Sequence, residues 1–193
     1  MRREQHVDKN PQADIEDIGR ALQGDGEAYA HLVRRYEAGI ARQMWHFTRD
    51  RATRDNLVHD VFVEAYLSLP TYQGKAPFEH WLRRIATRTG YRHWKNEARD
   101  RERKTSLELL CSAAIYPERL TPSEAAECAF HMLENLPAKD RLVLTLLHIE
   151  EWNVDEIAQC MGWSRALVKV RAYRARRKLR AQLEAEGFGK EPS

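Results

Sequence analysis

Apolar residues recur at three- and four-residue steps through most of this 193-residue chain. This spacing constrains the fold more than any other feature, because it is the period at which a helix buries one face. The apolar positions of the two clearest runs are Tyr29, Leu32, Val33, Tyr36, Ile40, Met44 and Phe47, and then Leu57, Val58, Val61, Phe62, Ala65, Tyr66 and Leu69. No stretch shows the two-residue alternation of β-branched residues that is typical of strands. The sequence therefore predicts an all-α fold.

Proline and charge divide the predicted helices into two groups. Between Thr105 and Thr121 the apolar period fades, proline appears and the charge turns acidic, as expected of a linker. Beyond it, the pattern predicts helices at 123–135, 138–150, 153–161 and 164–185. We therefore expect two small helical domains joined by a flexible linker. The expected parts are an N-terminal extension with a short helix (1–26), a first domain (27–104), the linker (105–122), a second domain (123–185) and a tail (186–193).

The formal net charge of +3 hides two strongly basic blocks. Residues 83–104 and residues 164–193 each carry nine basic and three acidic side chains, which leaves the rest of the chain at −9. Concentrated positive charge attracts phosphate backbones over about a Debye length, whereas the average over the chain says little. The charge pattern therefore predicts a nucleic-acid partner.

Composition excludes several other classes of protein. A hydrophobic content of 42% is enough for folding, and the longest nearly apolar stretch, Leu142 to Ile149, is far shorter than the roughly 20 residues of a membrane helix. The N-terminus has no apolar signal region, so we expect a cytoplasmic protein without membrane insertion. The three cysteines, Cys111, Cys128 and Cys160, lack the CxxC pairing of zinc sites, and we expect ordinary buried thiols.

The segment Val154 to Tyr173 has the spacing of a helix-turn-helix. Ala158 precedes Gly162 by four residues, and Gly162 precedes Val168 by six. Alanine lets two helices approach closely, glycine supplies the turn, and Ser164 is placed to cap the second helix. The spacing therefore predicts a DNA-reading motif.

The second helix of this motif is basic, with no acidic residue between Ser164 and Glu184. In a major groove, side chains near the N-terminus of such a helix reach base edges and later ones hold phosphates. By position, we assign Arg165, Lys169 and Tyr173 to bases, and Arg171, Arg174 and Arg177 to mixed or phosphate contacts, with Ser164 at the start of the site. A merely solvated basic helix is the alternative, but the turn motif and the charge asymmetry occur together.

A second basic segment, in the N-terminal half, is rich in aromatic residues. Pro70 and Pro77 bracket a predicted loop, 68–77, and a helix follows. The interleaved side chains are Tyr72, Phe78, Trp81, Tyr91 and Trp94 with Lys75, Arg83, Arg84, Arg88, Arg92 and Lys95. Cations beside exposed rings fit a surface that grips one strand and stacks unpaired bases. Because Phe78 and Trp81 have helical spacing with Ile85, they fit a core better, and the loop residues Tyr72 and Lys75 are the better candidates.

Three segments together resemble bacterial sigma factors of the extracytoplasmic-function (ECF) group. They are RDNLVHDVFVEAY, SLPTYQGKAPFEHWLRRIA and LPAKDRLVLTLLHIEEWNVDEIAQCMGWSRALVKVRAYRARRKLR. The resemblance runs from about Glu27 to Leu179. It implies an alternative sigma factor, which is not an enzyme and needs no cofactor, but binds core RNA polymerase and directs promoter-specific initiation.

The resemblance also implies roles for particular residues. The polymerase-binding helix falls on Asp55–Tyr66, where the residues expected to meet the clamp helices are Leu57, Asp60, Val63 and Glu64. Asn56 and His59 depart from the family pattern, which has an acidic residue and glutamine there. The flap of the polymerase is a further expected contact. An anti-sigma partner that covers these surfaces is also expected.

The loop 68–77 matches the element that captures a flipped base of the −10 promoter sequence, and the final helix matches the −35 reader. The residues expected at −10 DNA are Tyr72, Gly74, Lys75, Arg84, Arg88 and Arg92. Arg88 and Arg92 stand where the family usually has Asn and an Asp or Asn. Their added charge predicts a stronger grip on the DNA backbone and leaves a base-specific role for them in doubt.

Two other functions are alternatives from different classes. A stand-alone helix-turn-helix regulator would bind duplex DNA without joining the polymerase. A metal-dependent hydrolase would use some of the eight histidines, but no HExxH motif occurs and His59–Asp60 and Glu79–His80 are isolated pairs. The three ordered motifs favour the sigma factor.

Overall fold

A computed structural model describes residues 11–104 and 122–185, with side chains at 11–100 and 127–185. Regular structure in the described residues is entirely helical, which confirms the all-α prediction. The predicted linker up to residue 121, the tail at 186–193 and Cys111 lie outside the described residues. Contacts divide the chain into an N-terminal unit, Met1–His93, and a C-terminal unit, Trp94–Ser193. The division falls within a helix rather than at the predicted domain end at 104.

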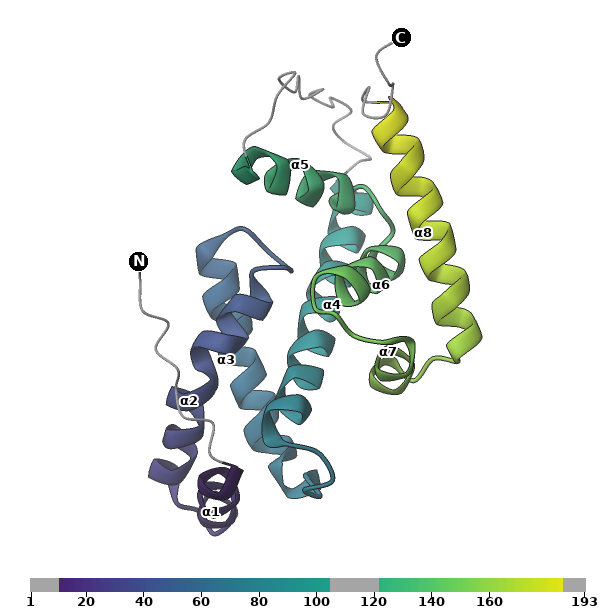
Figure 1. Cartoon of the computed structure of the whole chain (residues 1–193). Helices are drawn as coiled ribbons and strands as arrows, with labels where there is room; N and C mark the ends of the chain where they lie inside the picture. Colours follow the sequence, from purple (N-terminus) through teal and green to yellow (C-terminus); the bar gives the residue numbers. More distant parts are fainter. Residues whose placement is uncertain (1–10, 105–121, 186–193) are drawn as a thin grey trace. The chain divides into compact units, whose positions relative to one another are not determined.

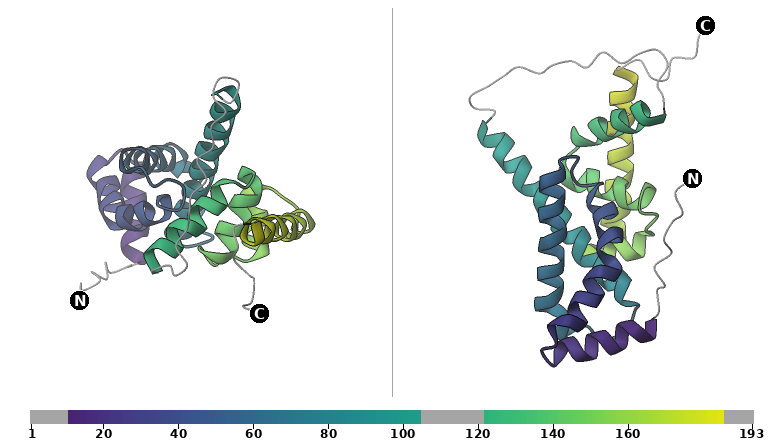
Figure 2. Two further views of the ribbon diagram at one scale, coloured as in Figure 1. Left: turned by 90° about the horizontal axis from the view of Figure 1, so that it is seen from above. Right: turned by 90° about the vertical axis from the view of Figure 1, so that its left-hand side faces the viewer.

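The N-terminal unit is a small helical bundle (Figure 1). Its elements are α1 (Pro11–Leu22), α2 (Gly26–Met44), α3 (Arg51–Ser68), the 3-10 turn η1 (Leu69–Thr71) and the first part of α4 (Phe78–Lys104). The short helix expected before residue 27 is α1. It lies across the ends of α2 and α3, as the right-hand view of Figure 2 shows.

Capping residues determine where these helices begin. The Asp25 carboxylate accepts the first free N–H groups of α2, and Asp50 accepts the N–H of Thr53 at 2.7 Å in α3. The predicted loop 68–77 is shorter in the structure. The Ser68 hydroxyl donates to the Glu64 carbonyl at 2.6 Å, α3 continues to that residue, and Pro70 lies in η1, where its missing N–H costs nothing. The open loop is therefore 72–77.

Most residues of the two apolar runs are buried in the core of the N-terminal unit, while Tyr29 and Val33 are half-buried. The fully buried side chains of this core include Leu32, Met44, Phe47, Val61, Leu69, Phe78 and Leu82. Tyr66, predicted in the apolar stripe, is instead 46% exposed and packs edge-on against Tyr29. A buried amide joins α2 to α4, since Gln43 donates to the Thr87 hydroxyl at 2.9 Å.

The C-terminal unit contains the predicted helix-turn-helix. Its described helices besides the end of α4 are α5 (Pro122–Glu134), α6 (Ala138–His148), α7 (Val154–Met161) and α8 (Arg165–Ala185), close to the predicted spans. Asn153 begins α7 with a capping box, and Gly162 ends it in the left-handed conformation at φ +66°. The Ser164 hydroxyl accepts the N–H of Leu167 at 3.1 Å and so caps α8. Local signals alone therefore fix both ends of the turn.

The buried side of this motif faces α6. Helix spacing predicts that Ile157, Leu167 and Val168 lock the two helices together. Ile157 and Val168 are buried, as is Ala158, but Leu167 is 38% exposed. Cys128 and Cys160 are buried thiols that form no disulfide, which confirms the expectation for these two cysteines.

Candidate functional sites

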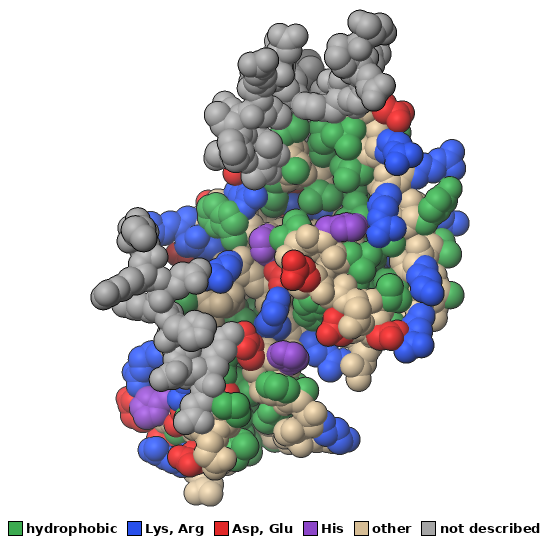
Figure 3. Space-filling model, in the orientation of Figure 1, with side chains coloured by type: hydrophobic (Ala, Val, Ile, Leu, Met, Phe, Trp, Pro, Cys, Tyr) green, Lys and Arg blue, Asp and Glu red, His purple; other side chains and the backbone are tan. Residues whose placement is uncertain are grey.

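The recognition helix α8 has one buried and one exposed face. Val168, Ala172 and Ala175 face the core. The side chains on the opposite face, spaced by three and four residues, are Ala166, Val170, Tyr173, Arg174 and Arg177. Figure 3 shows Lys and Arg side chains along α8, interspersed with hydrophobic ones. We call this exposed set the reading face.

The side chains of α8 that were assigned to DNA by their position divide into an exposed group and one residue, Arg171, that turns inward. Lys169, Arg174 and Arg177 are exposed, and Tyr173 is 67% exposed. Arg165 is exposed too, but it forms an ion pair with Asp155 of α7. Tyr173, Arg174 and Arg177 therefore belong to the reading face, and Lys169 lies beside it.

Arg171 differs from its neighbours because it points back into the unit. Its guanidinium lies 3.4 Å from the buried Asp140 carboxylate and 5.4 Å from the centre of the Trp163 ring. Lys178 reaches the other oxygen of Asp140 at 2.6 Å. A buried carboxylate needs such partners, so Arg171 stabilises the motif from inside.

Two apolar side chains of α8 are exposed although they were not assigned to the DNA site from the sequence. Leu167 is 38% exposed and Val170 is 45% exposed. Apolar side chains on a reading helix suit the methyl groups of thymine. The signal that could have found Val170 is its spacing, three residues before Tyr173 and seven before Arg177.

The exposed face of α3 combines an acid with apolar side chains. Asp60 is exposed, Val63 is 44% exposed and Leu67 is 73% exposed. We call these three residues the α3 docking face. Leu67 was not predicted, although it follows Val63 by four residues on the same side. Leu57, expected among the polymerase contacts, is only 6% exposed because it continues the buried stripe of Val61.

Glu64 lies at the edge of this face and is already paired. Its carboxylate accepts from Arg92 of α4 at 2.6 Å and lies 3.4 Å from the Thr89 hydroxyl. Two residues that were predicted for different surfaces, Glu64 for polymerase and Arg92 for DNA, therefore touch each other.

The loop 72–77 is a small turn closed by a hydrogen bond from a side chain to the backbone. The Tyr72 hydroxyl donates to the Ala76 carbonyl at 2.7 Å, and Gly74 at the bend has φ +67°, a conformation that favours glycine. Lys75 is exposed beside this bend. Burial, together with the nearby Asp14 carboxylate, raises the pKa of the Tyr72 hydroxyl above its usual value.

Beside the loop, α4 presents a basic face. Trp81, Arg84, Arg88 and Arg92 recur at helical spacing on one side of the helix. Arg88 and Arg92 are exposed, while Trp81 and Arg84 are partly buried. Phe78 is 2% exposed, which confirms that it belongs to the core. We call the four residues the α4 basic face.

The described residues contain neither a metal-binding cluster nor a membrane-spanning helix. Within the described side chains, no three His, Cys, Asp or Glu residues gather where they could hold a metal ion. None of the described helices is long and apolar enough to cross a membrane.

Two family models match the two halves of the chain. Sigma-70 region 2 matches residues 32–100, which include the α3 docking face, the loop and the α4 basic face. Sigma-70 region 4 matches residues 126–179, which include the helix-turn-helix. The two models appear in the order that the sequence motifs predicted.

Curated relatives match over most of their own length. The ECF RNA polymerase sigma-E factor of Haemophilus influenzae is 26% identical over 180 residues, covering 86% of this chain and 93% of that protein. The RNA polymerase sigma-H factor of Pseudomonas aeruginosa is 28% identical over 171 residues, covering 82% and 88%. The sigma-E factor of Escherichia coli is 28% identical over 169 residues, with the same coverage.

Solved structures agree with these matches. CnrH, solved in complex with the cytosolic domain of CnrY, is 28% identical and aligns with a TM-score of 0.57 over 90% of this chain and 98% of its own. The sigma factor RpoE from Bartonella quintana, solved with the anti-sigma factor NepR, shares the fold at 17% identity, with a TM-score of 0.57 over 81% and 96%. With both sigma-70 regions in place, this chain belongs to the sigma-70 family and is an alternative sigma factor of the ECF group.

Proposed function

We propose that the α3 docking face binds the clamp helices of core RNA polymerase. Asp60 presents a carboxylate one turn before the exposed apolar side chain of Val63, and the exposed Leu67 follows one turn later. Such a face suits a partner helix that carries arginine beside apolar residues. Glu64 contributes at the edge, and Leu57 supports the face from the core rather than by contact. The flap of the polymerase is the proposed partner of the C-terminal unit.

The loop 72–77 and the α4 basic face then hold the −10 sequence as a single strand. The loop takes a flipped base, with Tyr72, Gly74 and Lys75 around it, and the three arginines of α4 follow the strand backbone. Flipping costs a few kcal/mol, which contacts to the extruded base offset. Arg88 and Arg92 act through charge, because a guanidinium on a phosphate carries no sequence information by itself.

The reading face of α8 enters the major groove of the −35 duplex. Lys169 and Tyr173 contact bases, Arg174 and Arg177 hold phosphates, and Val170 contacts thymine methyl groups. Arg165 joins them after leaving Asp155, and Ser164 holds the start of the helix. Arg171 supports the motif instead of touching DNA.

This protein works by binding and supplies no catalytic group. It acts in the cytoplasm, where RNA polymerase meets DNA. We also propose that an anti-sigma protein covers its polymerase- and DNA-binding surfaces. The relative CnrH is solved in complex with the cytosolic domain of CnrY, which supports a protein partner of this kind of chain.

The observation that carries the proposal is the pairing, in one region 2 unit, of an exposed acidic and apolar helix face with a loop beside arginines. Gel filtration with purified core polymerase tests it. Asp60→Arg and Val63→Glu should weaken association at least tenfold, whereas Glu37→Arg, a change at an exposed position of α2, should not. All three variants should bind an isolated −35 duplex like the original chain. If the unaltered chain binds that duplex but never co-elutes with polymerase, it is a stand-alone regulator.

A further inference from the structure

Helix α1 buries two carboxylates that no function described so far uses. It precedes the region matched by the family model at residues 32–100. Asp14 is only 6% exposed and Asp17 only 7% exposed. Burying a charge is costly unless the group is paired and hydrogen-bonded. A short helix that needed only an anchor would do better with apolar side chains, which often replace buried ion pairs at no loss of stability.

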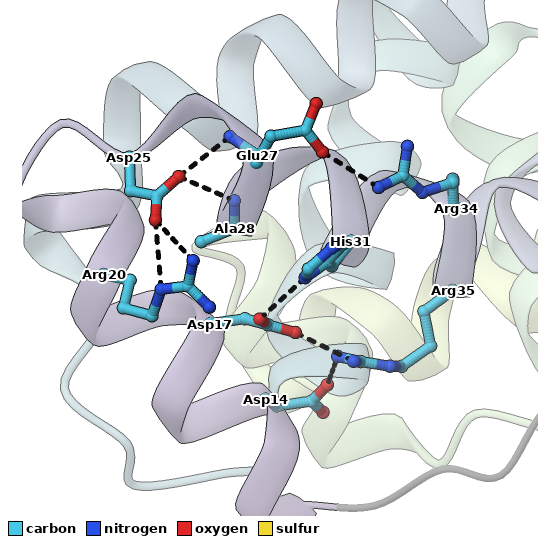
Figure 4. Close-up of polar contacts among 9 residues, drawn as sticks. All are labelled: Asp14, Asp17, Arg20, Asp25, Glu27, Ala28, His31, Arg34 and Arg35. Atoms are coloured by element: carbon cyan, nitrogen blue, oxygen red, sulfur yellow. Dashed lines mark hydrogen bonds and ion pairs between the residues drawn. The ribbon is translucent and has the colours of Figure 1, made fainter.

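Both carboxylates are held by α2 (Figure 4). Arg35 binds Asp14 through one terminal nitrogen at 2.5 Å and Asp17 through the other at 2.8 Å. The second oxygen of Asp17 lies 3.2 Å from Nδ1 of His31. The second oxygen of Asp14 accepts a hydrogen bond from the Tyr36 hydroxyl. The network therefore fixes the place of the Tyr36 side chain as well as that of α1.

The Tyr36 ring connects this network to the loop. Its centre lies 5.5 Å from the Phe78 ring, and Phe78 lies 5.6 Å from Tyr72, edge to face. Trp81 closes the cluster at 5.4 Å from Tyr72 and 5.5 Å from Phe78. Such ring pairs stabilise their arrangement beyond the area they bury. The first residue of the loop thus rests on rings whose position depends on α1.

A second connection runs through the backbone. Helix α1 also contacts η1, the turn from which the loop leaves. The Asp14 carboxylate is close enough to Tyr72 to raise the pKa of its hydroxyl. The loop is therefore supported by α1 at its start and under its aromatic residue.

We infer that α1 positions the loop 72–77 for DNA, with Asp14, Asp17 and Tyr36 as positioning residues that do not touch DNA themselves. The inference rests on the proposed role of the loop at the −10 sequence. A loop held in its binding shape loses less conformational freedom when a base enters, and so binds it more tightly. Loosening α1 should reduce the grip on the flipped base and leave polymerase binding and −35 binding unchanged.

The test uses the full chain assembled with core polymerase and a promoter that this holoenzyme transcribes. The probe is a non-template single strand of the −10 sequence, compared with strands that carry one abasic site. The ratio of the two affinities measures base capture alone. Tyr36→Phe keeps the ring and removes only the hydroxyl, and Asp14→Asn removes the charge. The control is Arg34→Ala, which breaks the exposed Arg34–Glu27 pair of 3.2 Å on the same helix.

Tyr36→Phe and Asp14→Asn should each lower the base-capture ratio at least fivefold, with affinities for core polymerase and the −35 duplex within twofold of the original. Arg34→Ala should change none of the three. If both variants unfold more easily in urea yet keep the original ratio, α1 is only an anchor and the inference is wrong. If the unaltered holoenzyme itself shows no abasic effect, the proposed role of the loop fails instead.

Discussion

Close packing against Phe47 requires glycine at position 90 of α4. A Cβ built there would lie 2.4 Å from the ring of Phe47, which is itself only 2% exposed. The ring has no room to move away, so a methyl group at this position overpacks the core. The close approach of α4 to the end of α2 therefore depends on glycine.

We expect Gly90→Ala to lower the free energy of unfolding by about 1–3 kcal/mol, as overpacking generally does. Gly39→Ala is the matched control, because Gly39 lies in α2 with nothing within 4 Å of its added Cβ. That change should raise stability by about 0.5–1 kcal/mol through helix propensity. Urea unfolding followed by circular dichroism measures both. Equal stability of the two variants would contradict the packing of Phe47 on Gly90.

Arg171 and Arg174 carry the same charge on the same helix and should behave differently. Arg171→Ala should cost about 1–2 kcal/mol of stability, since it takes one partner from the buried Asp140 carboxylate. Arg174→Ala should change stability by less than about 0.5 kcal/mol, but should weaken −35 duplex binding and reduce its salt dependence by about one counterion. Unfolding curves and affinities at several salt concentrations measure this, and the reverse result would exchange the two roles.

This division could not be predicted from the sequence. Charge and spacing placed both arginines on a DNA-reading helix, and only the position of Asp140, 31 residues before Arg171, shows which one turns inward. Leu57 is a second example. The apolar pattern predicted it in the core and the family resemblance predicted it at the polymerase contact, and the structure buries it in the core.

At the scale of single helices, the capping box at Asn153 holds the start of the helix-turn-helix. Its side chain accepts the N–H groups of Asp155 at 2.9 Å and Glu156 at 3.0 Å, and Glu156 accepts the Asn153 N–H at 2.7 Å. Asn153→Ala should lower stability by roughly 1 kcal/mol. Gln159→Ala, at an exposed position of the same helix, should leave it nearly unchanged. Thermal unfolding compares them, and equal melting temperatures would show that the cap contributes nothing.

Helix α1 should loosen in acid. Burial opposes ionisation of Asp17, but hydrogen bonds from Arg35 and His31 outweigh it and lower the pKa of Asp17 below its usual value. The unfolded chain therefore binds this proton more readily than the folded one. The stabilisation from Asp17 is complete above the unfolded pKa of about 4 and is lost as the pH falls from there toward the folded pKa.

Urea midpoints between pH 6 and pH 3 measure this loss. The curve of the original chain should fall more steeply below about pH 4 than that of Asp17→Asn, which has no carboxyl to titrate. Glu16→Gln, at an exposed carboxyl of the same helix, is the control. Asp25 and Asp50 also have lowered pKa values and lose stabilisation in acid in every variant. The contribution of Asp17 is therefore the difference between the curves of the original chain and Asp17→Asn. Parallel curves for Asp17→Asn and the original chain would show that Asp17 is not ionised in the fold.

Element boundaries were predictable wherever a local signal marks them. Gly162 and Ser164 were read correctly from the sequence, because a turn glycine and a capping serine act within a few residues. The loop was predicted too long, because Pro70 stops an α-helix but fits the first turn of a 3-10 helix. The role of α1 could not be predicted, since the contacts of Asp14 with Arg35 and Tyr36 span more than 20 residues.

For the whole molecule, the charge distribution explains the modest net charge of +3. One basic block includes Arg84, Arg88 and Arg92 of α4, and the other includes the exposed Lys169, Arg174 and Arg177 of α8. The sequence predicted this division and the family. The sequence did not predict every residue of each surface, because the exposure of Val170 and Leu67 is known only from the structure.

The central claim is that both regions act together within a polymerase, and run-off transcription tests it most directly. Purified core polymerase and this chain are supplied with a library of promoter fragments, and the transcripts are sequenced. We predict transcripts from a restricted set that shares one −35 and one −10 sequence, and their loss with Asp60→Arg. Binding of −35 duplexes without any transcript that depends on this chain would contradict the account.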